Sequence, residues 1–173
     1  MDIVNIILGN ICSILAMGTD AISSSKKTIN GMLWVQNISQ LIYGISSLFL
    51  KGYSATVQNV VCIIRNLAVI KGVKSKIAEW SLLTLGVVIG LYFNNLGIMG
   101  LLPIIANLQY TLAVFRFKDN QRIIKFSFLI HSVLFAFFSL AVLNFVGVCT
   151  NWVVAGSTVI FLIKTKKVKK KQS

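Results

Sequence analysis

The chain has 173 residues, of which 56% are hydrophobic and 12% are charged, and its mean hydropathy is +0.82. A soluble domain usually carries about 25% charged residues, so this chain has too few charges to cover a water-facing surface and is expected in a lipid bilayer. The net charge of +13 would suit binding to nucleic acid. The basic residues, however, lie between apolar runs and in a tail over 165–173. This placement is typical of membrane topology and argues against a nucleic-acid partner.

Seven apolar stretches follow one another along the chain. Each is close to the roughly 17–25 residues that an α-helix needs to cross a bilayer. In chain order they cover 3–18, 31–50, 53–70, 80–96, 97–115, 123–143 and 145–163. We therefore predict one all-α transmembrane domain over 1–173 with seven transmembrane helices.

Basic residues mark every second connection between these stretches. The connections after the first, third and fifth stretches are basic, as is the tail, whereas the others hold only Lys51. Loops rich in lysine and arginine stay in the cytoplasm, which predicts an external amino terminus and a cytoplasmic carboxyl terminus. The alternation requires the weak stretch 80–96 to be a crossing, because without it the tail would lie outside.

An internal repeat is visible at an offset of 92 residues. The offset pairs similar residues of the two halves: Tyr43 with Phe135, Ser47 with Ser139, and Asn59 with Asn151. The predicted plan is a three-helix repeat over 1–72, a linker helix over 79–96 and a second three-helix repeat over 97–164. An intervening single helix makes two such triplets parallel, as in the 3+1+3 plan of SWEET-like transporters, where substrate binds between the repeats.

Polar side chains follow one face of several predicted helices. The candidate substrate-binding residues are Asn37, Asn59, Asn107, His131 and Asn151, with the repeat-matched pair foremost. Amides both donate and accept hydrogen bonds, which suits a small neutral, sugar-like solute. The alternative interpretation is that these side chains only join helices to one another.

Other unusual residues leave two interpretations open. His131, the single histidine, is either a hydrogen-bonded structural residue or a proton relay. Arg65 either extends to the headgroups or holds an anionic solute or lipid.

Two further features concern the shape and packing of the helices. Pro103 is a predicted hinge. Gly86 with Gly90 predicts a close contact with another helix or another subunit, so a homo-oligomer remains open.

Acidic residues are few, and we expect none of them inside the membrane. Asp2, Asp20, Glu79 and Asp119 are the four acids, and all lie at the ends of apolar stretches or between them. No carboxylate is then available for proton coupling, metal binding or acid–base catalysis, and the three cysteines show no metal-site spacing. We expect no enzyme activity, no cofactor and no metal.

Three short motifs resemble the YgjV-type bacterial inner-membrane proteins. They are the run Leu101–Ile105, the pair Ile130–His131 before an aromatic-rich run, and the small-residue stretch Gly52–Ala55 leading to Arg65. The resemblance implies a bacterial inner membrane location and a distant similarity to the SWEET and PQ-loop (MtN3-like) transporters.

In those transporters, paired asparagines of the third and seventh helices line the substrate site, and Asn59 and Asn151 are the matching positions here. The chain departs from their pattern because it keeps only Pro103 as a hinge proline and lacks the Pro-Gln pair.

These features together predict a facilitator for a small neutral polar solute. One alternative is a membrane scaffold or assembly partner whose basic tail binds anionic lipid. Another is the substrate-binding subunit of a vitamin uptake complex, which is similar in size but usually has six helices.

Overall fold

The computed structural model describes residues 2–24, 26, 28–73, 75–117 and 120–171, with the backbone alone for residues 21, 24 and 164–171. Over these residues the order of elements is α1 (Ile3–Ser24), α2 (Ile29–Phe49), α3 (Tyr53–Ile70), α4 (Lys76–Tyr92), α5 (Ile98–Arg116), α6 (Gln121–Ala141) and α7 (Phe145–Lys171). Each predicted apolar stretch corresponds to one helix, so the prediction of an all-α chain is confirmed. Residues 172 and 173 of the predicted tail lie outside the described residues.

Five of the described helices, α1, α3, α5, α6 and α7, are long and apolar enough to cross a membrane. α4 is short, at 17 residues. α2 has 21 residues but carries the amides Asn30, Gln36, Asn37 and Gln40, which lower its hydropathy. The chain is thus built to cross a membrane several times, and a crossing by all seven helices stays a prediction.

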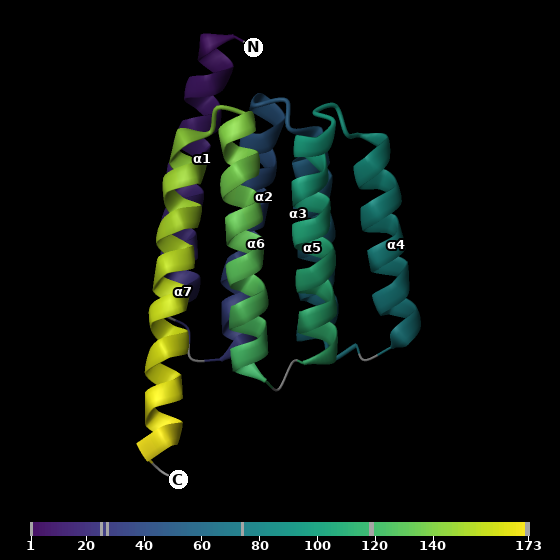
Figure 1. Cartoon of the computed structure of the whole chain (residues 1–173). Coiled ribbons are helices and arrows are strands. Elements are labelled where there is room, and N and C mark those ends of the chain that lie inside the picture. The colour runs from purple at the N-terminus through teal and green to yellow at the C-terminus, as the bar shows by residue number, and fades with distance from the viewer. Residues whose placement is uncertain (1, 25, 27, 74, 118–119, 172–173) are drawn as a thin grey trace.

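Six helices form a ring, and α4 lies outside it. α1 packs on α2, α2 on α3, α5 on α6 and α6 on α7, while α3 against α5 and α1 against α7 complete the ring. Within the described part of the chain, α4 packs only on α3 and α5, at one edge of the bundle (Figure 1).

The G-x-x-x-G pair joins α4 to this ring. A Cβ added at Gly90 would lie 2.5 Å from the Gln58 side chain and 3.0 Å from Ile104, and one at Gly86 would lie 3.4 Å from Val61. Gln58 Nε2 also donates to the Gly86 carbonyl oxygen at 2.7 Å. Gly86 and Gly90 therefore pack against other helices of the same chain, which is one of the two contacts expected for them, the other being with another subunit.

The two ends of the bundle differ in charge. The amino terminus and the connections α2–α3, α4–α5 and α6–α7 lie at one end in Figure 1, and the carboxyl terminus and the other connections lie at the opposite end. We name the second the basic end, because Lys26, Lys71, Lys76 and Arg116 lie there, and the first the amino-terminal end. Which end faces the cytoplasm stays a prediction.

The sequence offset of 92 residues recurs in the backbone. Both ends of α6 lie 92 residues after the corresponding ends of α2. Each of the two helices begins at a side-chain cap, Thr28 for α2 and Asn120 for α6. Each is followed by a tight turn in which a non-glycine residue, Lys51 (φ 54°) or Leu143 (φ 58°), adopts the left-handed conformation, which such residues rarely take.

Two apolar clusters pack inside the ring, one toward each end. The cluster toward the basic end consists of Leu33, Val69, Tyr110, Val114 and Ile124. The cluster at the amino-terminal end consists of Leu50, Ala55, Phe138 and Val142. In lipid, van der Waals packing of this kind holds helices together, because lipid tails are as apolar as these side chains and the hydrophobic effect does not drive helix association. Between the clusters, polar side chains face the inside of the ring.

Candidate functional site

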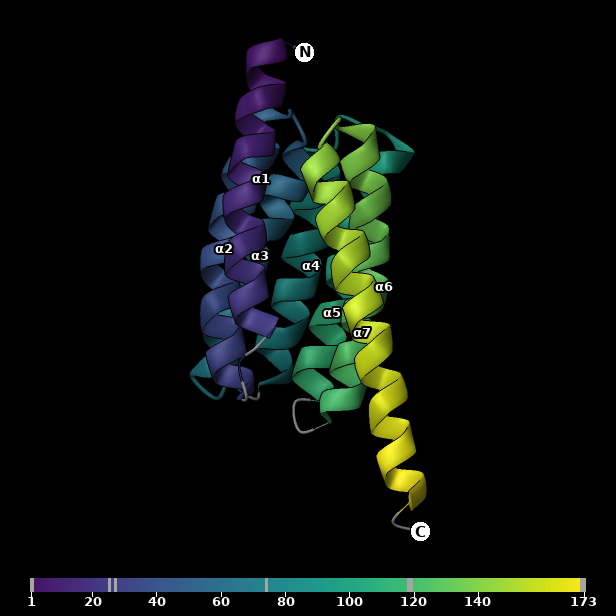
Figure 2. The same cartoon turned by 90° about the vertical axis from the view of Figure 1, so that its left-hand side faces the viewer.

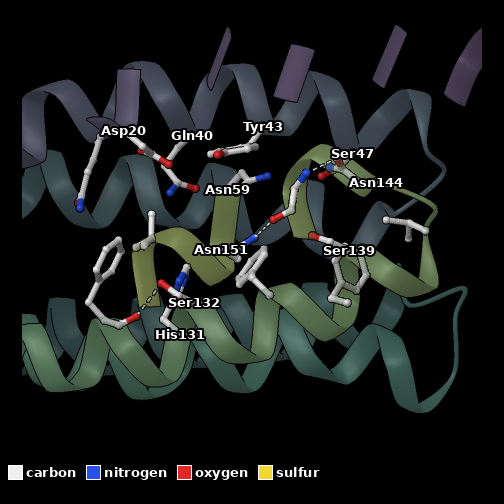
Figure 3. A pocket seen from close by; sticks show the side chains of 17 residues that line it. Asp20, Gln40, Tyr43, Ser47, Asn59, His131, Ser132, Ser139, Asn144 and Asn151 are labelled. Carbon is white, nitrogen blue, oxygen red and sulfur yellow. Dashed lines mark hydrogen bonds between the residues drawn. The ribbon is translucent and has the colours of Figure 1, made fainter. Parts of the chain in front are cut away.

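A central cavity lies inside the ring, between α1, α2 and α3 on one side and α6 and α7 on the other (Figure 3). Its volume is about 50 Å³, which is room for a few water molecules at about 10–15 Å³ each. The polar residues that line it are Asp20, Gln36, Gln40, Tyr43, Ser47, Asn59, His131, Ser132, Ser139, Asn144 and Asn151. Polar groups gathered inside a membrane bundle mark a candidate site for a polar ligand.

Much of the lining comes from matched positions of the two halves. The lining residues that correspond at the offset of 92 are Gln36 with Phe128, Gln40 with Ser132, Tyr43 with Phe135, Ser47 with Ser139, and Asn59 with Asn151. α2 and α6 therefore present corresponding faces to one cavity. Asp20 has no such counterpart, because the matching position is Leu112 of α5, so the carboxylate lies on one side only.

Three of the predicted site residues meet at this cavity: Asn59, His131 and Asn151. Asn59 is 3% exposed, and its Nδ2 has no hydrogen-bond partner. Asn151 Nδ2 donates to the Gly147 carbonyl oxygen at 2.7 Å. The amide of Asn59 is thus a free donor at the wall of the cavity.

The structure does not bring Asn37 and Asn107 to the central cavity. Asn37 is buried on α2, and neither of its amide atoms has a partner. Asn107 on α5 is 2% exposed, and its Nδ2 donates to Gln58 Oε1 at 2.8 Å. Asn107 therefore joins helices, which is the alternative interpretation given above for the polar faces.

His131 is packed among aromatic rings. Its ring lies 4.6 Å from that of Phe135, 5.8 Å from that of Phe128 and 5.5 Å from that of Tyr110, measured between centroids. A proton relay needs a series of titratable groups at hydrogen-bonding distance. The aromatic neighbours favour the structural interpretation of His131.

Asp20 is a lining residue that sequence reasoning missed. The prediction ends the first stretch at residue 18, whereas α1 continues to Ser24 and its membrane-length segment includes Asp20. The carboxylate faces the hydroxyls of Ser39 and Tyr43 on α2, and Figure 3 shows Tyr43 directed toward it. Asp20 is the last residue of that segment, as expected, but its carboxylate lines the central cavity, which was not expected. The available signal was the apolar pair directly after Asp20, which continues the helical stretch.

A second cavity, the vestibule, adjoins the central cavity on the side of the basic end. Its volume is about 360 Å³. Asp20, Gln36, Phe128 and Val154 line both cavities, and the vestibule reaches Lys125 near the start of α6. Figure 2 shows α1 and α7 diverging toward this end. The vestibule therefore leads from the basic end to the central cavity, with Asp20 at the junction.

Hydrogen bonds close the ring at the amino-terminal end. Asn144 Nδ2 donates to Ser13 Oγ at 2.8 Å. Asn10 Nδ2 donates to the Leu143 carbonyl oxygen at 3.1 Å, and Asn10 Oδ1 accepts from the Val146 N–H at 3.1 Å. These residues, which we name the amino-terminal seal, tie α1 to the turn between α6 and α7.

Arg65 lies in the interior and does not reach the headgroups. Its side chain is 1% exposed. Nε and Nη2 donate to Asn66 Oδ1 at 3.1 and 2.8 Å, and Nη1 donates to Asn107 Oδ1 at 2.9 Å. The interpretation that Arg65 extends to the headgroups is therefore wrong, and Arg65 lines neither cavity. It joins α3 to α5 on the side of the ring opposite the pair α1 and α7.

Pro103 is buried in α5, which runs unbroken from Ile98 to Arg116. A hinge at this position stays a prediction. The described residues contain no group of three or more His, Cys, Asp or Glu side chains arranged to hold a metal ion.

Comparison with known proteins agrees with the architecture and with the resemblance noted in the motifs. The sequence profile of Imp-YgjV, described as bacterial inner membrane protein, matches residues 7–169. No curated protein and no solved structure matches the chain. The match covers nearly the whole length, including every helix that contributes to the two cavities. The chain therefore belongs to the Imp-YgjV family of bacterial inner membrane proteins.

Proposed function

We propose that this protein is a facilitator that moves a small polar solute through the central cavity. The observation that carries the proposal is a single polar cavity lined from both halves, continued by a vestibule at one end and closed by hydrogen bonds at the other. A scaffold would need no polar cavity that is lined from both halves of the chain. Within this cavity, Asn59 Nδ2 is a donor without a partner in the bundle.

The proposed architecture is two parallel three-helix repeats, α1–α3 and α5–α7, with α4 as the linker. Three observations support it: the common offset of the helix ends, the matching left-handed turns at Lys51 and Leu143, and the matched residues of the lining. With the basic end in the cytoplasm, as the positive-inside rule predicts, the vestibule opens inward.

In this proposal the two halves of the bundle move relative to each other, so that the cavity opens to one face of the membrane and then to the other. A cavity of about 50 Å³ has room for only a few water molecules, so solute binding requires the halves to part. The hydrogen bond from Arg65 to Asn107 connects α3 to α5 on one side of the ring. On the opposite side, α1 and α7 are joined through the amino-terminal seal. Breaking the seal and bringing α1 and α7 together at the basic end would expose the cavity to the other face.

The test replaces both cavity asparagines, as Asn59→Ala with Asn151→Ala, in protein reconstituted into liposomes. Uptake of a panel of labelled small polar solutes identifies a transported one. Its flux should fall about fivefold or more in the double variant, since two amide contacts contribute about 0.5–1.5 kcal/mol each. Asn30→Ala is the matched control, because Asn30 is exposed at the basic end of α2, and it should leave flux unchanged.

Unchanged flux in the double variant would reject the cavity as the path. No flux for any solute in the panel would favour the scaffold. A pair of ATPase subunits that purifies with the chain would favour the vitamin uptake complex.

A further inference from the structure

The central cavity carries a charge on one wall. Asp20 is the acidic residue among its lining side chains, and no lysine or arginine belongs to that lining. Ser39 and Tyr43 hydroxyls face the carboxylate, but hydroxyls leave its charge uncompensated. The described residues contain one ion pair, Arg116 with Glu79 at 2.8 Å, and it does not involve Asp20.

Two cations among the described residues, Arg65 and Lys125, make contacts with other groups. Arg65 is held by amide oxygens on α3 and α5 and lies outside the lining. Lys125 lines the vestibule, and its Nζ lies 5.2 Å from the centre of the Phe161 ring. A buried carboxylate without a counterion costs several kcal/mol in a bilayer, so the site favours a ligand that brings a positive charge.

The other walls of the cavity are rich in aromatic rings. Tyr43 from α2 and Phe128, His131 and Phe135 from α6 line it together with Asp20. The three α6 rings form a continuous stack, with centroid distances of 5.8 and 4.6 Å. A carboxylate among aromatic faces is the environment that binds organic ammonium groups, because the ring quadrupole attracts the cation while the carboxylate neutralises it.

We propose that the solute carries a protonated amino group, which the Asp20 carboxylate binds against the aromatic wall of the central cavity, with Asn59 as a donor for the polar remainder. The inference rests on the proposed function only for the location of the site. It replaces the neutral, sugar-like solute expected from the sequence by a small organic ammonium compound.

The experiment measures binding directly, on the full chain in lipid nanodiscs, by calorimetry at neutral pH. The probes are ethanolamine and its neutral analogue ethylene glycol, which share a skeleton and differ in the ammonium group, with tetramethylammonium, sodium ion and glucose as further probes. We expect ethanolamine to bind at least about tenfold more tightly than ethylene glycol. Preference for ethylene glycol, glucose or sodium ion would overturn the proposal.

Variants then assign the site. Asp20→Asn should weaken ethanolamine binding at least about tenfold, whereas Asp20→Glu, which keeps the charge, should retain measurable selectivity. Asp2→Asn is the matched control, since it removes the same charge at the exposed start of the chain, and it should change nothing. Ethanolamine binding that is equally tight in Asp20→Asn would overturn the assignment.

Phe135→Leu keeps the proposal testable if Asp20→Asn does not fold. It should weaken tetramethylammonium binding about two- to fivefold and leave ethylene glycol binding unaffected; equal effects on both probes would contradict the aromatic contribution.

Failure of the transport proposal and failure of the ammonium proposal give different results. Ethanolamine binding without flux of any solute would reject transport alone, and flux of a neutral solute that is unchanged in Asp20→Asn would reject the ammonium site alone.

Discussion

Arg65 stabilises the bundle through neutral oxygens. A guanidinium in hydrocarbon is costly unless its donors are satisfied, and here two amide oxygens and the Thr111 hydroxyl oxygen, at 3.4 Å, accept from it. The Tyr110 ring beneath the guanidinium adds a cation–π contact at 4.6 Å. These partners lie on α3 and α5, so one residue holds together helices from both halves of the chain.

Replacing Arg65 should therefore weaken the fold. Arg65→Met leaves Asn66 Oδ1 without its donor and removes a donor to Asn107 Oδ1, which we expect to lower the free energy of unfolding by about 1–3 kcal/mol. The measurement is thermal or detergent-induced unfolding of the purified protein. Arg122→Met is the control, because Arg122 is exposed on α6 and should shift stability by less than about 0.5 kcal/mol. Equal stability of both variants would contradict a structural role for Arg65.

At the scale of elements, the position of α4 depends on glycine. Gly86 and Gly90 have no side chains, so α4 can approach α3 and α5 closely. The Gln58 side chain occupies the space beside them, and its Nε2 donates to the Gly86 carbonyl oxygen. At the basic end the Arg116 pair with Glu79 adds a second connection between α5 and α4. α4 is thus fastened at the side of the ring remote from α1 and α7.

Gly90→Ala tests this packing. The added Cβ would lie 2.5 Å from Gln58 Nε2 and 3.0 Å from Ile104, so the Gln58 bond must break or α4 must shift, and we expect a loss of about 1–3 kcal/mol. Gly156→Ala in α7 is the matched control, since nothing lies within 4 Å of its added Cβ, and it should be neutral or slightly stabilising. The melting temperatures of the two variants decide the matter; a stable Gly90→Ala protein would mean that α4 packs loosely.

At the scale of the whole molecule, helices that alternate in direction place the two termini at opposite ends (Figure 1). The basic residues gather at the carboxyl-terminal end. The predicted seven crossings would account for both features, because each crossing reverses the chain and the positive-inside rule then acts on every second connection.

Topology reporters test this arrangement in cells. A fluorescent protein fused after Ser173 should be fluorescent, and alkaline phosphatase at the same position should be inactive, because the basic end is expected in the cytoplasm. Phosphatase inserted after Asn94, between α4 and α5, should be active, and after Val73, between α3 and α4, it should be inactive. Active phosphatase after Ser173, or equal results at the two internal sites, would reject seven crossings.

Local sequence determined most of the secondary structure. Apolar runs of membrane length have little alternative to helix, since a backbone in lipid must satisfy its hydrogen bonds internally. The caps and turns of α2 and α6 recur at the offset of 92 even though their residues differ. The pairing of Asn59 with Asn151 at one cavity followed from the same offset.

Only the tertiary structure decided which polar side chains meet. Asn107 has the same helical polar pattern as Asn59, yet it faces Gln58 and Arg65, because α3 packs directly on α5. Asp20 lies near the end of an apolar stretch, and only the continuation of α1 beside α2 brings its carboxylate to the cavity. Helix formation depends on neighbours in sequence, whereas a site depends on which helix faces pack together, and that is set by contacts between residues far apart in the chain.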